Sequence, residues 1–222
     1  MSRSSFGIAY TFVQKQYEFH RDGVHIKAET GDVAIDAGGC WGETTMYFAH
    51  EVGKTGEVYS FEFIPSNLEV MYQNIKNNPH LADRVHLVES PIWTESNNRL
   101  YYVDWGPGSN VNTEKLRDTY VECFTKSIDD LVQEKNLRSV DFIKMDIEGA
   151  ELAALKGAEK AIRKFKPKLA ISVYHQLSDF TTIPKYLDSL GLDFEFHLDH
   201  HTIHTGETVL FALPAARKNR AI

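Results

Sequence analysis

A glycine-rich segment near the start of the chain has the residue types of a cofactor-binding turn. Asp36 is followed by Gly38, Gly39 and Gly42, and Thr45 lies just beyond them. Glycines allow the backbone to approach a ligand closely, and a helix that begins at such a turn offers unpaired N–H groups. We therefore expect a nucleotide-type cofactor to lie over this turn.

Glu62 supports the same interpretation from the end of the next expected strand. It stands about 20 residues after the last glycine of the turn, where an acidic side chain can accept hydrogen bonds from both hydroxyls of a ribose.

The charge at Asp36 separates two cofactors. The run Ala37-x-Gly39-x-x-Gly42 half-matches the turn of NAD-binding proteins. A carboxylate at the strand tip would face the pyrophosphate of NAD, whereas S-adenosylmethionine (SAM) has no phosphate and presents an ammonium and a sulfonium. We therefore expect SAM, with S-adenosylhomocysteine (SAH) as its product. The alternative is that Asp36 only caps the next turn and the glycines only permit tight packing.

Asp146 and His175 end neighbouring expected strands and are the candidates for the chemistry. An alcohol that accepts a methyl group must lose its proton, and histidine titrates near neutrality, so His175 is the expected base. Three roles stay open for Asp146: orienting the acceptor, aiding the base, or joining Glu148 in a weak divalent-metal site. The alternatives are that Asp146 and Glu148 cap the helix starting at Gly149 and that His175 is a hydrogen-bonded histidine at a loop entrance.

Four histidines gather around the last expected turn, namely His197, His200, His201 and His204. Their spacing fits no known metal site, so we expect solvated turn residues.

The elements that position these residues follow from short β-branched runs that alternate with longer helical segments. This alternation is typical of βαβ units and predicts a three-layer α/β, Rossmann-like fold with a mostly parallel sheet. The expected strands are 33–36, 58–62, 85–89, 140–145 and 169–174. The expected helices are 44–52, 66–77, 150–163 and 183–190, the second of which opens with Pro65 and a capping box of Ser66 and Glu69.

The pattern changes after Gly191. Segments 194–198 and 208–213 predict an antiparallel hairpin that closes the sheet. The stretch 93–125 is irregular, with strand-like 100–103 and 121–124, and its length predicts a connection that covers a site.

Length and composition agree with one globular domain, since the chain has 222 residues, of which 42% are hydrophobic and 25% charged. The net charge of −7 disfavours a nucleic-acid partner, because phosphates are neutralised by Lys and Arg. The chain has two distant cysteines, no apolar run near the roughly 20 residues of a membrane span, and no apolar signal-peptide core. We therefore expect a cytoplasmic protein.

The chain resembles the FkbM family of SAM-dependent methyltransferases over nearly all of residues 31–213. The strongest matching runs are Val33-Ala-Ile-Asp36-Ala-Gly38, Val58-Tyr-Ser-Phe-Glu62-Phe and Val140-Asp-Phe-Ile-Lys-Met-Asp146-Ile-Glu148-Gly149-Ala-Glu151. Ser127-Ile-Asp129-Asp130, Pro167-Lys-Leu-Ala-Ile-Ser-Val-Tyr-His175 and Glu207-Thr-Val-Leu-Phe match as well.

This resemblance implies a seven-stranded sheet whose last strand is antiparallel, with SAM bound over the strand ends. It also implies O-methylation of a sugar, as in polysaccharide modification, or of a natural-product hydroxyl, although some relatives act on nitrogen. The cofactor contacts expected beyond the glycine turn and Glu62 are Phe63, Asn67, Glu89, Ser90 and Asp146, and the resemblance places His200 and His201 at the acceptor pocket.

We expect residues 31–214 to form the methyltransferase domain, with 1–30 as an N-terminal extension or substrate cap and 215–222 as a basic tail. The expected partner is a small-molecule or glycan acceptor, and the oligomeric state stays open, a homodimer included. Two other functions stay open: an N-methyltransferase acting on a small molecule or nucleic acid, and a non-catalytic SAM-binding module. Asp146-Ile-Glu148 argues against base flipping, because amino-group methylases that flip bases carry an Asn/Asp-Pro-Pro-aromatic clamp there.

Overall fold

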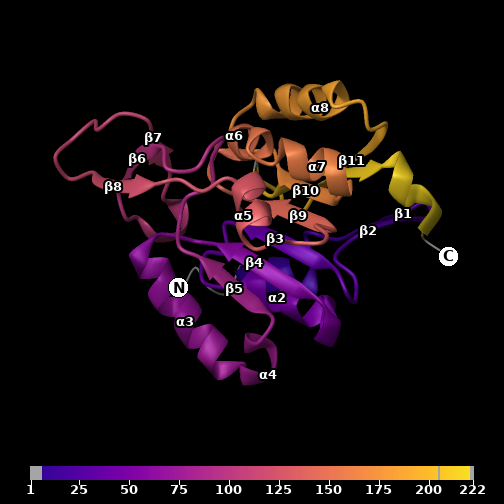
Figure 1. Cartoon of the computed structure of the whole chain (residues 1–222), viewed down its shortest axis with the longest axis horizontal. Coiled ribbons are helices and arrows are strands. Elements are labelled where there is room, and N and C mark those ends of the chain that lie inside the picture. Colours follow the sequence, from indigo (N-terminus) through magenta and orange to yellow (C-terminus); the bar gives the residue numbers. More distant parts are fainter. Residues whose placement is uncertain (1–6, 205, 221–222) are drawn as a thin grey trace.

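The core of the molecule is a seven-stranded sheet. The structure is a computed structural model that describes residues 7–204 and 206–220. The strands lie in the order β11-β12-β10-β9-β3-β4-β5 (Figure 1). In chain order they are β3 (Val33–Ala37), β4 (Glu57–Phe61), β5 (Val85–Val88), β9 (Phe142–Met145), β10 (Lys168–Ser172), β11 (Phe194–His200) and β12 (Thr208–Pro214).

The directions of the strands confirm the expected topology. Five strands, from β10 through β9, β3 and β4 to β5, pair in parallel. The last strand, β12, lies between β10 and β11 and is antiparallel to both. The carboxyl ends of the five parallel strands therefore meet at one edge of the sheet, and ligands bind beyond that edge in open α/β folds.

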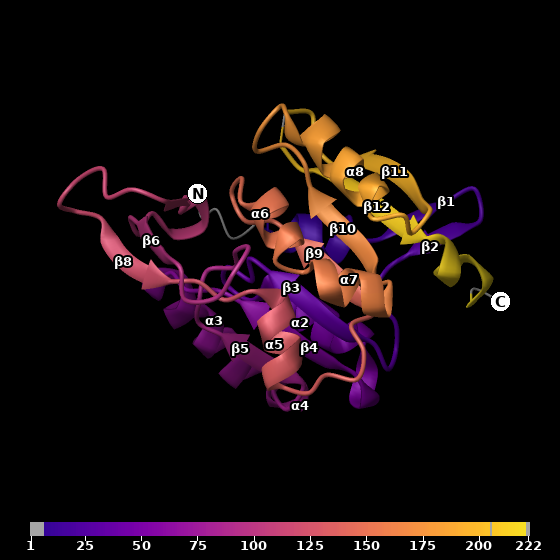
Figure 2. The same cartoon turned by 45° about the horizontal axis from the view of Figure 1, so that its top comes forward.

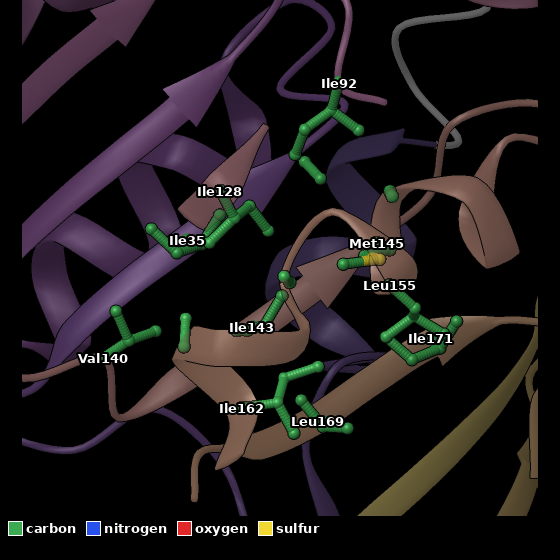
Figure 3. Packing of buried hydrophobic residues seen from close by; sticks show 14 of the residues in the cluster. Ile35, Ile92, Ile128, Val140, Ile143, Met145, Leu155, Ile162, Leu169 and Ile171 are labelled. Carbon is green, nitrogen blue, oxygen red and sulfur yellow. The ribbon is translucent and has the colours of Figure 1, made fainter. Parts of the chain in front are cut away.

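Helices cover both faces of the sheet. Alternate strand residues such as Ile35 and Ile143 pack with α5 (Ile128–Glu134), α6 (Glu151–Lys156) and α7 (Glu159–Phe165) (Figure 3). Helix α8 (Asp179–Ser189) contributes to the same cluster. The intervening residues, such as Phe142, pack with α2 (Glu43–Glu51) and α4 (Pro79–Ala82). Helix α3 (Pro65–Asn77) follows β4 and lies beside β5 (Figures 1 and 2). This period of two gives the sheet two apolar faces, which is typical of a doubly covered parallel sheet.

Two expectations about helices are wrong. Helix α3 begins at Pro65, Ile64 is its N-cap residue without a side-chain hydrogen bond, and the Ser66 hydroxyl donates to Asp104 rather than forming a capping box. The single helix expected over 150–163 is two helices, α6 and α7, which are separated at Gly157 and Ala158.

The irregular stretch 93–125 forms a small antiparallel sheet that projects from the body of the molecule (Figures 1 and 2). Its strands are β6 (Arg99–Tyr102), β7 (Val111–Asn112) and β8 (Val121–Phe124), and the short 3₁₀ helix η3 (Gly106–Gly108) precedes β7. Residues of η3 line a cavity, which is compatible with the expectation that this stretch covers a site.

The first and last described segments of the chain pack on the domain. A short π-helix η1 (Ala9–Val13) precedes a hairpin of β1 (Phe19–Arg21) and β2 (Val24–Ile26). Tyr17 and Phe19 are buried in the same apolar cluster as α2, so this part of the extension belongs to the body. The final 3₁₀ turn is η4 (Ala215–Arg220). An ion pair between Arg217 Nη2 and Asp141 Oδ1, at 2.8 Å, attaches it to the domain. Among the described residues, no helix is long and apolar enough to cross a membrane.

Candidate active site

A buried row of polar side chains crosses the sheet beneath the glycine turn. Asp36 on β3 is in register with Ser60 on β4 and Lys144 on β9, so the three side chains share one face. The Lys144 Nζ lies 3.1 Å from Asp36 Oδ1, and the Thr44 and Thr45 hydroxyls donate to Asp36 Oδ2 at 2.9 and 2.7 Å. All charges in the row are therefore paired, as buried charges must be.

This arrangement corrects the expected role of Asp36. The residue is completely buried and its carboxylate faces Lys144 and α2, so it does not face a ligand at the strand tip. Thr45 is likewise buried, and its hydroxyl donates a hydrogen bond to Asp36. The period of two in β3 explains this, because the side chain at position 36 must point to one face of the sheet and the partners on that face cover it.

Lys144 also fixes the glycine turn. Its Nζ donates to the carbonyls of Ala37 and Gly38 at 3.1 and 2.7 Å. Gly38 has a φ of 84°, and a Cβ atom there would lie 2.0 Å from the Asp146 carbonyl oxygen. Only glycine fits this close approach, so the turn is held at the tip of β9 by backbone packing and by one lysine.

Two adjoining cavities lie at the carboxyl ends of the strands. The β4 cavity, between the tips of β3 and β4 and the η3 loop, has a volume of about 580 Å³ when the open space at its mouth is included. The N-terminal cavity, between residues 7–17, the glycine turn and the ends of β9 and β10, has a volume of about 910 Å³ on the same basis. The residues common to both linings are Gly38, Cys40, Pro107, Asp146 and Glu148.

Most of the expected cofactor residues lie at these cavities. The β4 cavity is lined by Gly38, Glu62, Phe63, Asn67, Ser90 and Asp146, and the N-terminal cavity by Gly38, Gly39 and Asp146. Gly42 lies outside both linings and is the N-cap residue of α2. Glu89 is exposed, outside both linings, and accepts a hydrogen bond from Tyr72.

Glu62 is oriented by its own loop. Its Oε1 accepts the N–H groups of Phe63 and Ile64 at 2.7 and 2.8 Å, and its Oε2 accepts the Asn67 amide at 3.2 Å. Burial raises the pKa of Glu62 above its ordinary value. The carboxylate is thus held rigidly at the wall of the β4 cavity, which suits the recognition of paired hydroxyls.

Asp146 is a half-buried carboxylate at the junction of the two cavities. The Tyr17 hydroxyl donates to its Oδ2 at 2.9 Å and the Tyr174 hydroxyl to its Oδ1 at 3.0 Å. Burial opposes ionisation, but Lys144, His175 and the two tyrosines outweigh it and lower the pKa of Asp146. Neither tyrosine was expected from the sequence, and Tyr17 comes from the N-terminal segment that the family resemblance does not cover.

His175 lies behind this carboxylate rather than in the cavities. Its Nδ1 is 2.9 Å from the buried Glu151, and its Nε2 is 3.4 Å from Asp146 and 3.8 Å from Glu148. Burial lowers the pKa of His175, but Glu151, Asp146 and Glu148 outweigh it and raise the pKa to about 9. An imidazolium cannot accept a proton, so the structure argues against His175 as the general base.

The same cluster is the place where a divalent ion was expected. Among the described residues, Asp146, Glu151 and His175 form the one group of three potential metal ligands. The carboxylates approach both nitrogens of the ring, which is the arrangement that holds a protonated imidazole. Glu148 lies at the edge of this group, with its side chain 38% exposed and its φ at 56°.

The two expected acceptor histidines line neither cavity. The His200 Nδ1 contacts the Thr208 hydroxyl at 2.7 Å, and His201 is half-buried, with burial lowering its pKa. The strand β11 extends to His200, so these residues belong to the hairpin and its turn.

Carboxylates make up most of the charged groups in the lining of the two cavities. They are Glu43, Glu62, Asp146, Glu148 and Glu207. Among the described lining residues, the only Lys or Arg is Lys144, which is already paired with Asp36. A diphosphate would meet this wall without a free cation, whereas a cationic ligand would be attracted. The electrostatic preference expected of Asp36 is therefore provided by other residues.

Comparison with solved structures supports the same fold. The methyltransferase FkbM from Methylobacillus flagellatus KT is 26% identical, with a TM-score of 0.70 over 89% of this chain and 47% of that chain, so this chain spans about half its length. The SAM-bound fibrillarin of Aeropyrum pernix (14% identity, TM-score 0.54, 86% of this chain and 70% of that one) shares the fold. So does precorrin-6y C5,15-methyltransferase of Geobacter metallireducens GS-15 (13% identity, TM-score 0.53, 84% and 81%).

A search of curated proteins finds no significant match. A family model described as the methyltransferase FkbM domain matches residues 23–196, which is most of the chain and includes the glycine turn, Glu62, Asp146 and His175. The chain belongs to the FkbM methyltransferase domain family.

Proposed function

We propose that this chain binds SAM across the two cavities and methylates a hydroxyl group of a sugar or another small molecule. The observation that carries the proposal is the crevice formed by the two adjoining cavities, with carboxylates in the lining of each, at the carboxyl ends of β3, β4 and β9 in a chain of this family. A nucleoside would lie beside Glu62, and the charge of the lining favours a sulfonium and an ammonium.

Different residues of the chain would contact different parts of SAM. Glu62, supported by Asn67, would accept the ribose hydroxyls, and Phe63 and Ser90 would border the base. Gly38 would leave room for the remainder of SAM beside Asp146. Bound SAM would supply a methyl group that its positive sulfur has already activated. The protein's main contribution is then to align the acceptor with that methyl group.

The nature of the acceptor follows from the same lining. A polyanionic nucleic acid finds no unpaired cation among the described residues of the two cavities. The tyrosines Tyr17 and Tyr174 and the carboxylates offer hydrogen bonds that suit a polyhydroxyl compound. A second acceptor class, a small amine, is favoured by the acidic lining alone.

The cofactor assignment is tested by thermal unfolding in the presence of SAH or NAD. A ligand that binds only the native state at 100 times its dissociation constant adds about 2.7 kcal/mol to the free energy of unfolding. We expect this stabilisation from SAH and none from NAD. Stabilisation by NAD alone would reject the proposal.

A pair of variants on β4 locates the ribose site. We expect Glu62→Gln to weaken SAH binding about tenfold, since a charge-assisted hydrogen bond is lost, which is about 1.4 kcal/mol. Glu57→Gln, at the opposite end of the same strand, is the matched control and should bind SAH like the wild type.

The acceptor is identified by a separate experiment, mass spectrometry of sugars and metabolites incubated with isotope-labelled SAM.

A further inference from the structure

Glu207 is an acidic residue at the crevice that the sequence-based site does not include. It lines the N-terminal cavity together with Asp146, Tyr17 and Tyr174. Among the described residues, none donates a hydrogen bond to its carboxylate or forms an ion pair with it. In this respect it differs from Asp146, whose oxygens are already engaged by two tyrosines.

The backbone fixes Glu207 in this place. The carbonyl of Thr208 accepts the Val173 N–H at 3.0 Å, and the carbonyl of Glu207 accepts the His201 N–H at 3.1 Å. Glu207 itself has a φ of 58°, a left-handed conformation that is costly for a residue with a side chain. Cys40 and Glu148, at φ 49° and 56°, are further non-glycine residues of the crevice in this conformation. Such strained positions concentrate at functional sites.

The neighbouring groups leave Glu207 as the best placed proton acceptor. His175 carries a proton at neutral pH and lies behind Asp146. Asp146 is a weak base, because its neighbours lower its pKa. Burial raises the pKa of Glu148 as well, but its Oε2 lies 3.8 Å from the His175 Nε2, so it already faces a cation. Glu43 lies at the start of α2.

From this geometry we infer that Glu207 is the general base, which takes the proton of the acceptor hydroxyl during methyl transfer. The inference rests on the proposed function. As the acceptor oxygen forms its bond to the methyl carbon, the carbon–sulfur bond breaks, its electron pair stays on the sulfur, and the hydroxyl proton passes to the Glu207 carboxylate. The proton then passes from Glu207 to solvent water.

The acidity of Glu207 agrees with this role. Burial and the nearby Asp146 and Glu148 carboxylates raise its pKa to about 7, while His175 and Lys144 oppose the rise. A general base works best when its pKa lies near the pH of the reaction. A cationic ligand in the same crevice would favour the ionised form, which is the form that accepts a proton.

The first test needs no acceptor. A carboxyl group whose pKa is raised on folding, here from 4.5 to about 7, destabilises the fold as the pH rises through that window. Glu207→Gln removes this penalty, so its melting temperature should exceed that of the wild type at pH 8, with the difference shrinking toward pH 5. Glu69→Gln, on the exposed face of α3, is the control variant. A Glu207→Gln curve parallel to that of the wild type would overturn the inference.

The second test measures methyl transfer from labelled SAM to the acceptor identified as described above. We expect Glu207→Gln to lower kcat at least 100-fold and to leave the dissociation constant of SAH within about threefold, and Glu207→Asp to retain part of the activity. The wild type should lose activity below about pH 7. If SAH binds the wild type and methyl transfer occurs, but Glu207→Gln keeps its rate, the base is another group. If SAH fails to stabilise the wild type, the proposed function itself falls.

Discussion

At the scale of single residues, the decisive feature is a lysine inside an otherwise apolar strand. Lys144 is 1% exposed, yet it reaches Asp36, two carbonyls of the glycine turn and the ring of Tyr17, which lies 5.2 Å from its Nζ. Burial lowers its pKa, but Asp36 and Asp146 outweigh this and keep it charged. A charge in a buried strand requires a partner, so this residue could have been singled out from the sequence.

Lys144→Met should therefore affect both stability and binding. It leaves Asp36 buried without a counter-ion, which costs about 3–5 kcal/mol of unfolding free energy. It also frees the glycine turn, so SAH affinity should fall at least tenfold. Urea unfolding and calorimetric titration measure the two effects.

Lys168→Met is the matched control for this prediction. Lys168 is also buried and pairs with carboxylates, but it lies at the amino end of β10, away from the crevice. Its loss should reduce stability and leave SAH affinity unchanged. Equal loss of SAH affinity in both variants would mean that Lys144 acts only through the general stability of the domain.

At the scale of elements, the break between α6 and α7 shows tertiary structure overriding helical periodicity. The Asp129 carboxylate, from α5, accepts the N–H groups of Lys160 and Ala161 at 3.0 and 2.8 Å and so caps the start of α7. Gly157 packs so closely that a Cβ atom would lie 2.0 Å from the Trp93 carbonyl oxygen. The residues that break the helix thus come from segments that are distant in the sequence.

Gly157→Ala distinguishes local propensity from packing. Helix propensity alone would make alanine more stable by roughly 0.5–1 kcal/mol. We expect the opposite, a loss of about 1–3 kcal/mol, because the new methyl group overlaps a backbone atom. Gly108→Ala, with no atom within 4 Å of its Cβ position, should change stability little. If Gly157→Ala instead stabilised the protein, the packing of Gly157 against Trp93 would not be what separates α6 from α7.

At the scale of the whole molecule, charge is distributed so that the crevice is acidic. The chain carries a net charge of −7, and carboxylates line both cavities without a free lysine or arginine among the described lining residues. Such a surface raises the local concentration of cationic ligands.

Salt should therefore weaken SAM binding more than SAH binding, because SAM carries one more positive charge. The screening length falls from about 10 Å at 0.1 M salt to about 3 Å at 1 M. We expect the ratio of the SAM to the SAH dissociation constant to rise severalfold over this range in calorimetric titrations. A ratio independent of salt would contradict an electrostatic role for the lining.

The sequence by itself determined the order and type of the main elements. Strand β3, the glycine turn and Glu62 are encoded by local patterns of apolar, glycine and acidic residues, and the FkbM resemblance was carried by motifs at strand ends. Such patterns act over a few residues, so they are visible without any knowledge of tertiary contacts.

Tertiary structure decided which side chains meet. Strand register turned Asp36 toward Lys144, 108 positions away, and the fold brought Tyr17 and Tyr174 to opposite oxygens of Asp146. It also enclosed His175 among carboxylates and set Glu207 beside the crevice. The protonation state of an ionisable group depends on burial and on neighbours that only the folded chain assembles, and therefore the residue types suggested a base at His175 while their environment favours Glu207.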